Sequence, residues 1–179
     1  MLKTKILIKT PKRRHPSIII YNVQVDVPES EIQEIFKNHM HIDAELKLRF
    51  KFRGKSPNHQ NWIFETPAAE FSSLMQYNKI PICWQMHRLG EFFHYKLCNF
   101  CQSFGHTTKD CTFSTLSCGH CAGHHMTRDC NHEFITCVNC FKSNQNNGTN
   151  LPTWHHTRHS SCPYLQSEID KYRATRDYA

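Results

Sequence analysis

Three consecutive groups of cysteine and histidine constrain this chain more than any other feature of its sequence. The first group has the spacing C-x2-C-x4-H-x4-C and consists of Cys98, Cys101, His106 and Cys111. The second repeats it with a gap shorter by one residue and consists of Cys118, Cys121, His125 and Cys130. The third is stretched and contains Cys137, Cys140, a histidine and Cys162. Of the ten cysteines, only Cys83 is left over.

Three cysteines and one histidine are the ligand set of a closed structural zinc site. Zinc in such a site takes four nitrogen or sulfur ligands in a tetrahedron, whereas a catalytic zinc keeps one position open. Segments this short cannot build a hydrophobic core, so metal binding supplies their folding free energy. The spacing therefore predicts three bound zinc ions, all structural.

A disulfide or redox interpretation of these cysteines is less consistent with the rest of the sequence. The N-terminus lacks the apolar core of a signal peptide, and no apolar run has membrane length. Thiols kept in a reducing compartment are typically metal ligands. We therefore expect an intracellular protein, located in the nucleus and cytoplasm and not in a membrane.

The histidine ligand is ambiguous in two of the groups. In the second group His124 and His125 are adjacent, and the four-residue gap to Cys130 favours His125. In the third group the spacing leaves three candidates open, which are His155, His156 and His159. Residues 144–150 are rich in asparagine and are expected to form an exposed loop.

Residues 17–96 are expected to form a separate domain of class α+β. Strands are predicted over residues 17–25, 46–55, 60–65 and 82–88, and helices over residues 28–38 and from Pro67 onward with Thr66 as N-cap. This order fits a βαββαβ sandwich like the RNA-recognition motif, with other ferredoxin-like domains as the rival. Three small CCHC zinc knuckles would follow it.

Such a sandwich leaves one face of its sheet open for a ligand. Ile19 and Tyr21 should point outward there if Ile18 and Ile20 point inward. Trp62 is a candidate stacking residue on this face, although it could instead belong to the core. Alternation along residues 46–55 places leucines and phenylalanines on one side of a strand. Its cations lie on the other, and form a predicted phosphate-binding row of Lys47, Arg49, Lys51 and Arg53, followed by Lys55.

Charge is unevenly distributed along the chain, whose formal net charge is +7. Residues 1–97 carry a net +6 and residues 98–162 a net +1, which three zinc ions on nine thiolates would change to about −2. The electrostatic anchor for nucleic acid should thus lie upstream, in the sheet and in a basic arm over residues 1–16 that includes Lys12, Arg13 and Arg14. The knuckles should read bases by stacking, and the candidate side chains are Phe100, Phe104 and Met126.

The run CNFCQSFGHTTKDC from Cys98 resembles the first knuckle of Gag-like proteins, encoded by the first open reading frame of non-LTR retrotransposons. CGHCAGHHMTRDC from Cys118 is similar to their second knuckle, and CVNC with HHTRHSSCP to their third. The resemblance covers about residues 17–163 and implies binding of the element's own RNA, assembly with the reverse transcriptase into a ribonucleoprotein, self-association and nucleic-acid annealing. It also implies that His155 is the ligand of the third knuckle, because the family places six residues between the histidine ligand and the last cysteine.

The sequence therefore predicts a non-catalytic protein that binds mainly single-stranded RNA or DNA. Its expected parts are the arm, the sandwich, knuckles over residues 98–111, 118–130 and 137–162, and a short helix within residues 163–179 that packs on the third knuckle. A protein-interaction adaptor, or a host protein descended from a mobile element, is the alternative. A cross-braced zinc domain of the ubiquitin machinery is disfavoured, because each C-x-x-C is followed at once by its own histidine and cysteine. The sequence shows no catalytic motif.

Overall fold

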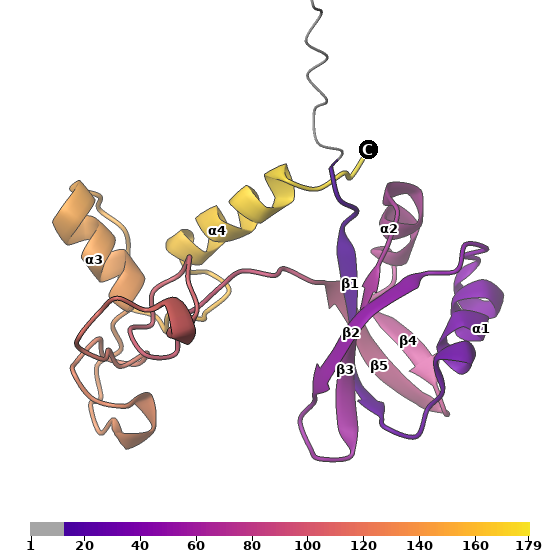
Figure 1. Ribbon diagram of the computed structural model, residues 1–179, viewed down its shortest axis with the longest axis horizontal. Coiled ribbons are helices and arrows are strands. Elements are labelled where there is room, and N and C mark those ends of the chain that lie inside the picture. The colour runs from indigo at the N-terminus through magenta and orange to yellow at the C-terminus, as the bar shows by residue number, and fades with distance from the viewer. Residues whose placement is uncertain (1–12) are drawn as a thin grey trace, which may run out of the picture. The chain divides into compact units, whose positions relative to one another are not determined.

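The computed structural model describes residues 13–179, which form two compact units joined by two crossings of the chain (Figure 1). The first unit comprises residues 13–92 together with 175–179, and the second comprises residues 93–174. In the first unit the elements follow the order β1 (Ser17–Gln24), α1 (Glu29–Met40), β2 (Lys47–Arg53), β3 (His59–Glu65), α2 (Ala68–Leu74), β4 (Lys79–Ile82) and β5 (Gln85–Glu91). The expected α+β class is confirmed.

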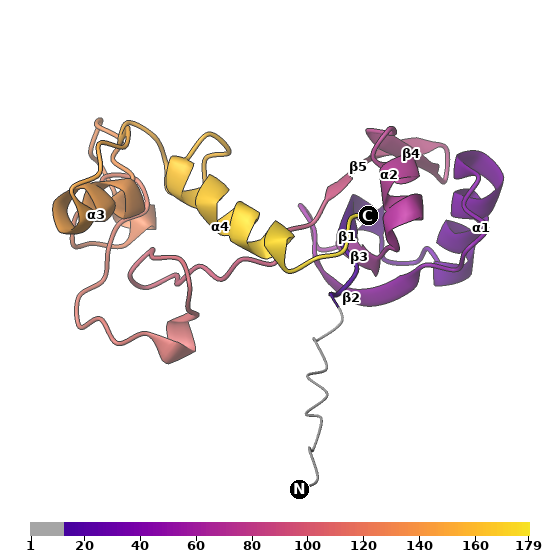
Figure 2. The ribbon, with the colours of Figure 1, turned by 90° about the horizontal axis from the view of Figure 1, so that it is seen from above.

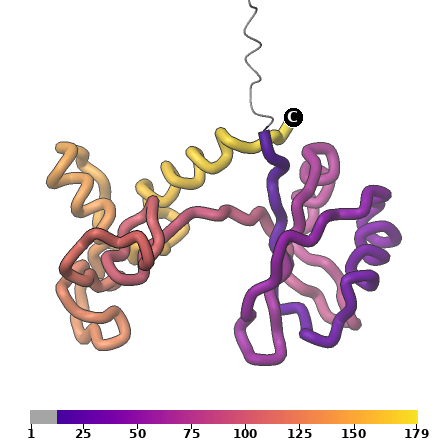
Figure 3. The backbone as a smooth tube through the Cα atoms, viewed as in Figure 1, coloured from indigo at the N-terminus to yellow at the C-terminus, as the bar shows by residue number. Residues whose placement is uncertain are grey.

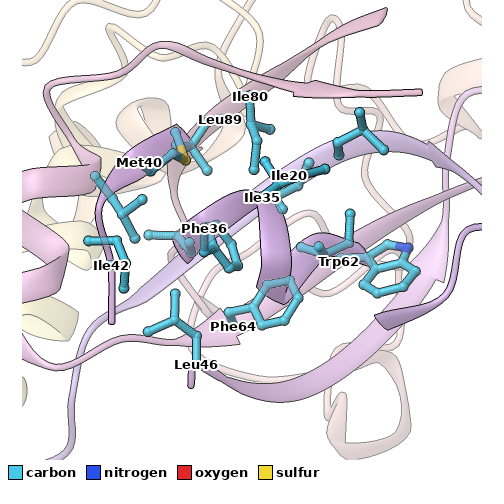
Figure 4. Close-up of a cluster of buried hydrophobic side chains, with 14 of the residues drawn as sticks. Ile20, Ile35, Phe36, Met40, Ile42, Leu46, Trp62, Phe64, Ile80 and Leu89 are labelled. Atoms are coloured by element: carbon cyan, nitrogen blue, oxygen red, sulfur yellow. The ribbon is translucent and has the colours of Figure 1, made fainter. Parts of the chain in front are cut away.

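The first unit is built on one antiparallel sheet with the strand order β2-β3-β1-β5-β4. Ile18 and Ile20 of β1 point to the side that α1 and α2 cover, and they pack there with Phe36 of α1 and Leu74 of α2. Figure 4 shows the centre of this core, where Phe36 meets Phe64 edge to face at 5.3 Å between ring centroids. Burial of these apolar side chains holds both helices on one face of the sheet.

The prediction of a single last strand over residues 82–88 is wrong. The chain there forms a hairpin, in which β4 pairs with β5 through a turn of two residues, Cys83 and Trp84. Such turns usually carry Asn-Gly or Asp-Gly, whose backbones tolerate positive φ. Cys-Trp gives no comparable signal.

The uninterrupted alternation predicted along residues 46–55 is also wrong. Leu48 pairs with Phe64, but Phe50 pairs with Ile63, so that Arg49 is an extra residue in a β-bulge. A bulge of one residue transfers all following side chains to the opposite face of the sheet. Phe50 and Phe52 therefore lie on the face away from the helices, and the predicted row of cations is divided between the two faces.

Trp62 is a core residue, which corrects its assignment to an exposed stacking position. It pairs with Ile20 of β1, faces the helices and is 0% exposed (Figure 4). The ammonium nitrogen of Lys51 lies 3.3 Å from the centroid of its ring, which places Lys51 on the helix side as well. An indole enclosed in this way cannot stack on a base.

Two other element boundaries differ from expectation. Thr66 is buried and does not cap the next helix, because α2 begins at Ala68 and Pro67 is its N-cap. The predicted loop over residues 144–150 is largely helical, since α3 (Val138–Asn147) continues to Gly148, whose φ of 62° ends it. Runs of asparagine are poor helix formers, so the helix is stabilised by its tertiary contacts.

The second unit contains α3, α4 (Pro163–Ala174) and two single 3-10 turns, joined by long irregular segments (Figures 2 and 3). The expected C-terminal helix is confirmed, and its residues Leu165 and Ile169 pack against the third cysteine group. Residues 175–179 then return to the first unit, where Tyr178 meets Phe71 of α2 edge to face. Within residues 13–179, none of the helices has both the length and the apolarity required to cross a lipid bilayer.

Two phenylalanines of the first unit allow a matched test of this core. Phe36→Ala removes a fully buried ring and should lower the free energy of unfolding by about 3–5 kcal/mol. Phe52→Ala removes a ring that is 42% exposed and should cost about 0.5 kcal/mol. Native-state hydrogen exchange of the β1 and β3 amides measures both values. Equal losses would contradict the placement of Phe52 outside the core.

Candidate metal centres

The described part of the chain brings the predicted ligands together in three separate clusters. In each cluster one ligand atom per residue lies within 4.8 Å of all the others. The clusters are Cys98, Cys101, His106 and Cys111; Cys118, Cys121, His125 and Cys130; and Cys137, Cys140, His155 and Cys162. All three can hold a metal ion, and their composition is that of zinc sites.

The distances between ligand atoms match one tetrahedral ion in each cluster. With zinc–sulfur bonds of about 2.3 Å, neighbouring ligands in a tetrahedron lie about 3.8 Å apart. In the third cluster the Sγ of Cys162 lies 3.7 Å from the Sγ atoms of both Cys137 and Cys140. The Nε2 of His155 lies 3.5 Å from the Sγ of Cys140. The corresponding sulfur–nitrogen separations in the first and second clusters are 3.3 Å and 3.6 Å.

The first two clusters are built by the same local structure. The residue after the second cysteine has positive φ in both, 56° at Gln102 and 62° at Ala122, and donates its N–H to the carbonyl of the first cysteine. In both clusters a threonine hydroxyl also accepts a hydrogen bond from the N–H of the residue after the first cysteine. Thr108 accepts from Asn99, and Thr127 accepts from Gly119. The turn brings the two thiols of each C-x-x-C together, so that both can bind the same metal ion.

The third cluster replaces this turn by a helix N-terminus. Cys137 is the N-cap of α3, and Cys140 lies in its first turn. The thiol of Cys162 and the backbone N–H groups of Cys140 and Asn139 donate to the Cys137 sulfur and lower the pKa of Cys137 to about 5. The same hydrogen bond to Cys137, followed by burial, raises the pKa of Cys162. One thiolate is therefore favoured in this cluster even without metal.

In the first cluster the pKa of Cys98 is also lowered. Burial acts to raise it, but donation from the backbone of Cys101 and Phe100 and from the neighbouring thiols outweighs burial and lowers the pKa to about 6. A preformed thiolate in each of these two clusters suits metal binding, because the thiolate is the form that binds a metal.

The structure selects between the histidines that the spacing left open. His125 faces the second cluster, whereas His124 lies near the carbonyl oxygen of Leu116. His155 belongs to the third cluster. The assignment of His156 as a zinc ligand is wrong, because its ring lies against His120, and His159 instead contacts the hydroxyl of Ser161.

The three clusters are joined by specific hydrogen bonds within the second unit. The Ser117 N–H donates to the Phe100 carbonyl at 2.9 Å and links the first two clusters. The Thr136 N–H donates to the His120 carbonyl at 2.7 Å and links the second to the third. The side chain of Asn139, on α3, donates to the Gln102 carbonyl at 2.7 Å and links the third to the first. The array is therefore one compact body.

Phe104 contributes to this compaction and is not available as a base-reading residue. It is 8% exposed, and its ring stacks on Tyr164 at 6.0 Å and meets Tyr95 edge to face at 5.6 Å. Its assignment to nucleic-acid stacking is therefore wrong. Phe100 and Met126 are the other two predicted base-stacking side chains. Phe100 is half-buried, and Met126 is 49% exposed, as a side chain that stacks on a base would be.

Each cluster instead has an exposed aromatic residue that the spacing argument did not single out. Phe113 follows the last cysteine of the first cluster and Phe134 that of the second, while Trp154 directly precedes His155. The exposed fractions of Phe134 and Trp154 are 71% and 78%. Their positions within four residues of a ligand could have been noticed in the sequence, but their exposure could not.

The other predicted nucleic-acid contacts fall into three places in the first unit. Tyr21 and Lys47 lie on the sheet face away from the helices, and Arg49 donates to the Ser17 hydroxyl there at 2.9 Å. Arg53, like Lys51, follows the bulge and lies on the other face. Arg13 and Arg14 are exposed before β1, and Lys12 lies outside the described residues.

Two further cations on the open face were not predicted. Arg88 of β5 lies over the Tyr21 ring, with its guanidinium carbon 5.3 Å from the ring centroid. Lys79 of β4 is the register partner of Arg88 and is exposed as well.

Comparison of the chain with protein-family models, curated proteins and solved structures found no match.

Removing metal should unfold the second unit and leave the first unit intact. A strong zinc chelator should abolish amide protection in residues 93–174, because few apolar side chains are buried there besides the ligands, while β1 and β3 stay protected. Elemental analysis should give three ions per chain, and about two after Cys130→Ser. Cys83→Ser is the matched control and should keep three. Unchanged protection after chelation would contradict structural metal.

Acid should release the metal, since protons compete for the thiolates. A cysteine with a lowered pKa stabilises its cluster above that pKa and loses the contribution as pH falls through it. Before metal binds, the pKa of Cys98 is about 6 and that of Cys137 is about 5, and bound zinc holds the thiolates against protonation. Zinc should therefore stay bound at neutral pH and be lost in acid, below these values. A colorimetric zinc indicator measures the release. Loss on raising the pH from 7 to 8 would contradict thiolate ligation.

Proposed function

We propose that this chain is a non-catalytic protein that binds single-stranded RNA or DNA and depends on three structural zinc ions. The observation that carries the proposal is the set of three closed Cys3His clusters, each with an exposed aromatic side chain beside it. Four protein ligands leave no coordination position for water, which favours a structural metal over a catalytic one. Exposed aromatics on small rigid loops are suited to stacking on unpaired bases.

The first unit supports the proposal through the order of its strands. The elements β1, α1, β2, β3, α2 and β5 follow a βαββαβ sequence with β1 and β3 at the centre of the sheet, as in an RNA-recognition motif. In this interpretation β4 is an added hairpin strand. We propose that the unit is a domain of that kind and that the clusters are CCHC knuckles.

The open sheet face has the chemistry that such a ligand requires. Phe52 is exposed on it, and Phe50 meets Phe92 edge to face at 5.7 Å between ring centroids. The usual aromatic positions on the central strands are occupied by Ile19 and Ile63, which are both buried. Stacking on this face would therefore depend on the edge strand β2, beside the cations Lys47 and Arg49.

The knuckle sequences extend the proposal to a biological role. Their resemblance to Gag-like proteins of non-LTR retrotransposons suggests that the ligand is an element's own RNA. Assembly of a ribonucleoprotein with the reverse transcriptase, and annealing of nucleic acid within it, would be the activity. The basic character of residues 1–97, with a net charge of +6, supports binding of a polyanion.

Pairs of cations on the two faces of β2 provide a matched test. Lys47→Gln with Arg49→Gln removes two charges from the open face, and should flatten the log–log salt slope of oligonucleotide binding by about 1.4. Lys51→Gln with Arg53→Gln removes two charges from the other face and should change it little. Phe52→Ala should weaken binding about tenfold with little effect on the slope. Fluorescence anisotropy with a labelled single strand measures all three.

The proposal fails if micromolar protein does not bind random single-stranded oligonucleotides at low salt. If both double variants change the slope equally, binding exists but does not use the open sheet face.

A further inference from the structure

The tip of the β4–β5 hairpin is held in an unfavourable backbone conformation. Ile82 and Gln85 are paired, and the two residues between them, Cys83 and Trp84, have φ of 47° and 63°. Turns of this type favour asparagine and glycine, because other side chains are strained at positive φ. A cysteine and a bulky tryptophan therefore make this turn less stable than the commonest sequences would. Strain of this kind is typical of positions kept for function.

The same turn exposes large apolar side chains. Trp84 has a relative exposure of 105%, and Met86 beside it is 61% exposed. Tryptophan and methionine are enriched in protein interfaces, where burial of their large surface supplies much of the binding free energy. Fold stability does not explain Trp84, because a fully exposed ring contributes no core packing.

A groove of about 400 Å³ lies next to this tip, between α1 and β4. Glu31 and Glu34 of α1 line one side, and Pro81, Cys83 and Trp84 line the other. With histidine neutral, these carboxylates carry the only formal charges among the described lining residues. The Cys83 thiol donates to the carboxylate of Glu31 at 3.2 Å, and this hydrogen bond raises the pKa of Cys83, so the thiol stays protonated.

The groove differs from the proposed nucleic-acid surface in both charge and position. It adjoins α1, on the side of the sheet opposite Phe52 and Lys47. Its carboxylates would repel phosphate and attract cations. Strand addition is also disfavoured, because β4 is a short edge strand that contains Pro81. A ligand should therefore bind through its side chains.

From these observations we propose that Trp84 and the acidic groove form a docking site for a cationic segment of a partner protein. A lysine or arginine of the partner would contact Glu31 and Glu34, and an apolar side chain next to it would pack against Trp84. The indole face adds attraction for a cation. This site is independent of the proposed nucleic-acid binding and would remain if that proposal failed.

The strained turn allows a variant that separates binding from folding. Cys83→Asn with Trp84→Gly installs the residues that the turn prefers, so the first unit should unfold at the same or a higher temperature. The same variant removes the docking side chain. We expect it to bind the probe peptide Lys-Lys-Leu-Lys-Leu-Lys about tenfold more weakly than the zinc-loaded wild-type chain does in isothermal titration calorimetry.

Single charge variants test the electrostatic part of the site. Glu34→Gln should weaken peptide binding and reduce its dependence on salt, whereas Glu45→Gln, an exposed carboxylate that does not line the groove, should change neither. A peptide with glutamate in place of lysine should not bind.

Three results would overturn the proposal. They are undiminished peptide binding by the Cys83→Asn, Trp84→Gly variant, equal binding of the glutamate peptide, and the absence of measurable binding by the wild-type chain at low salt. Trp84-dependent sedimentation with phosphatidylcholine vesicles, without peptide binding, would instead assign the tip to a lipid surface.

Discussion

Convergence of four ligand atoms on one point, repeated three times, is the constraint on which the second unit depends. Its buried residues are mainly the cysteines themselves and the few side chains around them, such as Phe104 and Leu165. A segment with so little apolar interior needs another source of folding free energy, and metal coordination is the natural one. The hydrogen bonds between the three clusters then join them into one body. This fixes the positions of their exposed aromatic side chains relative to each other.

The first unit shows how one inserted residue can redistribute a binding surface. The bulge at Arg49 moves Phe50 and Phe52 to the open face and moves Lys51 to the side of Trp62. The result is a face on which aromatic rings and cations are mixed, instead of one with a uniform row of cations. Mixed surfaces of this kind combine stacking with phosphate attraction, so the bulge changes which residues carry the proposed function and leaves its chemistry intact.

Charge and strain divide the first unit into two surfaces of opposite character. The open face carries Lys47, Arg49 and Arg88, while the groove beside α1 carries Glu31 and Glu34. An unfavourable turn and a fully exposed tryptophan stand beside that groove. A protein that brings other molecules to a nucleic acid would need two such surfaces, because one surface cannot attract a polyanion and a cationic partner at once.

The sequence by itself determined which cysteines form clusters, because ligand spacing within a short loop is a local property and metal geometry is strict. It also determined the α+β class and most helices and strands, since hydrophobic periodicity is local as well. Ligand spacing left the histidine of the third cluster open, and the tertiary structure confirmed His155, which the resemblance had implied, because His155 and His156 differ in direction and not in residue type. The β4–β5 hairpin is a local pairing, but its turn residues Cys83 and Trp84 carry no hairpin signal. The burial of Trp62 and Phe104 and the bulge in β2 depended on contacts with other strands and loops. Such pairings are set by packing between distant strands and loops, which no local pattern encodes.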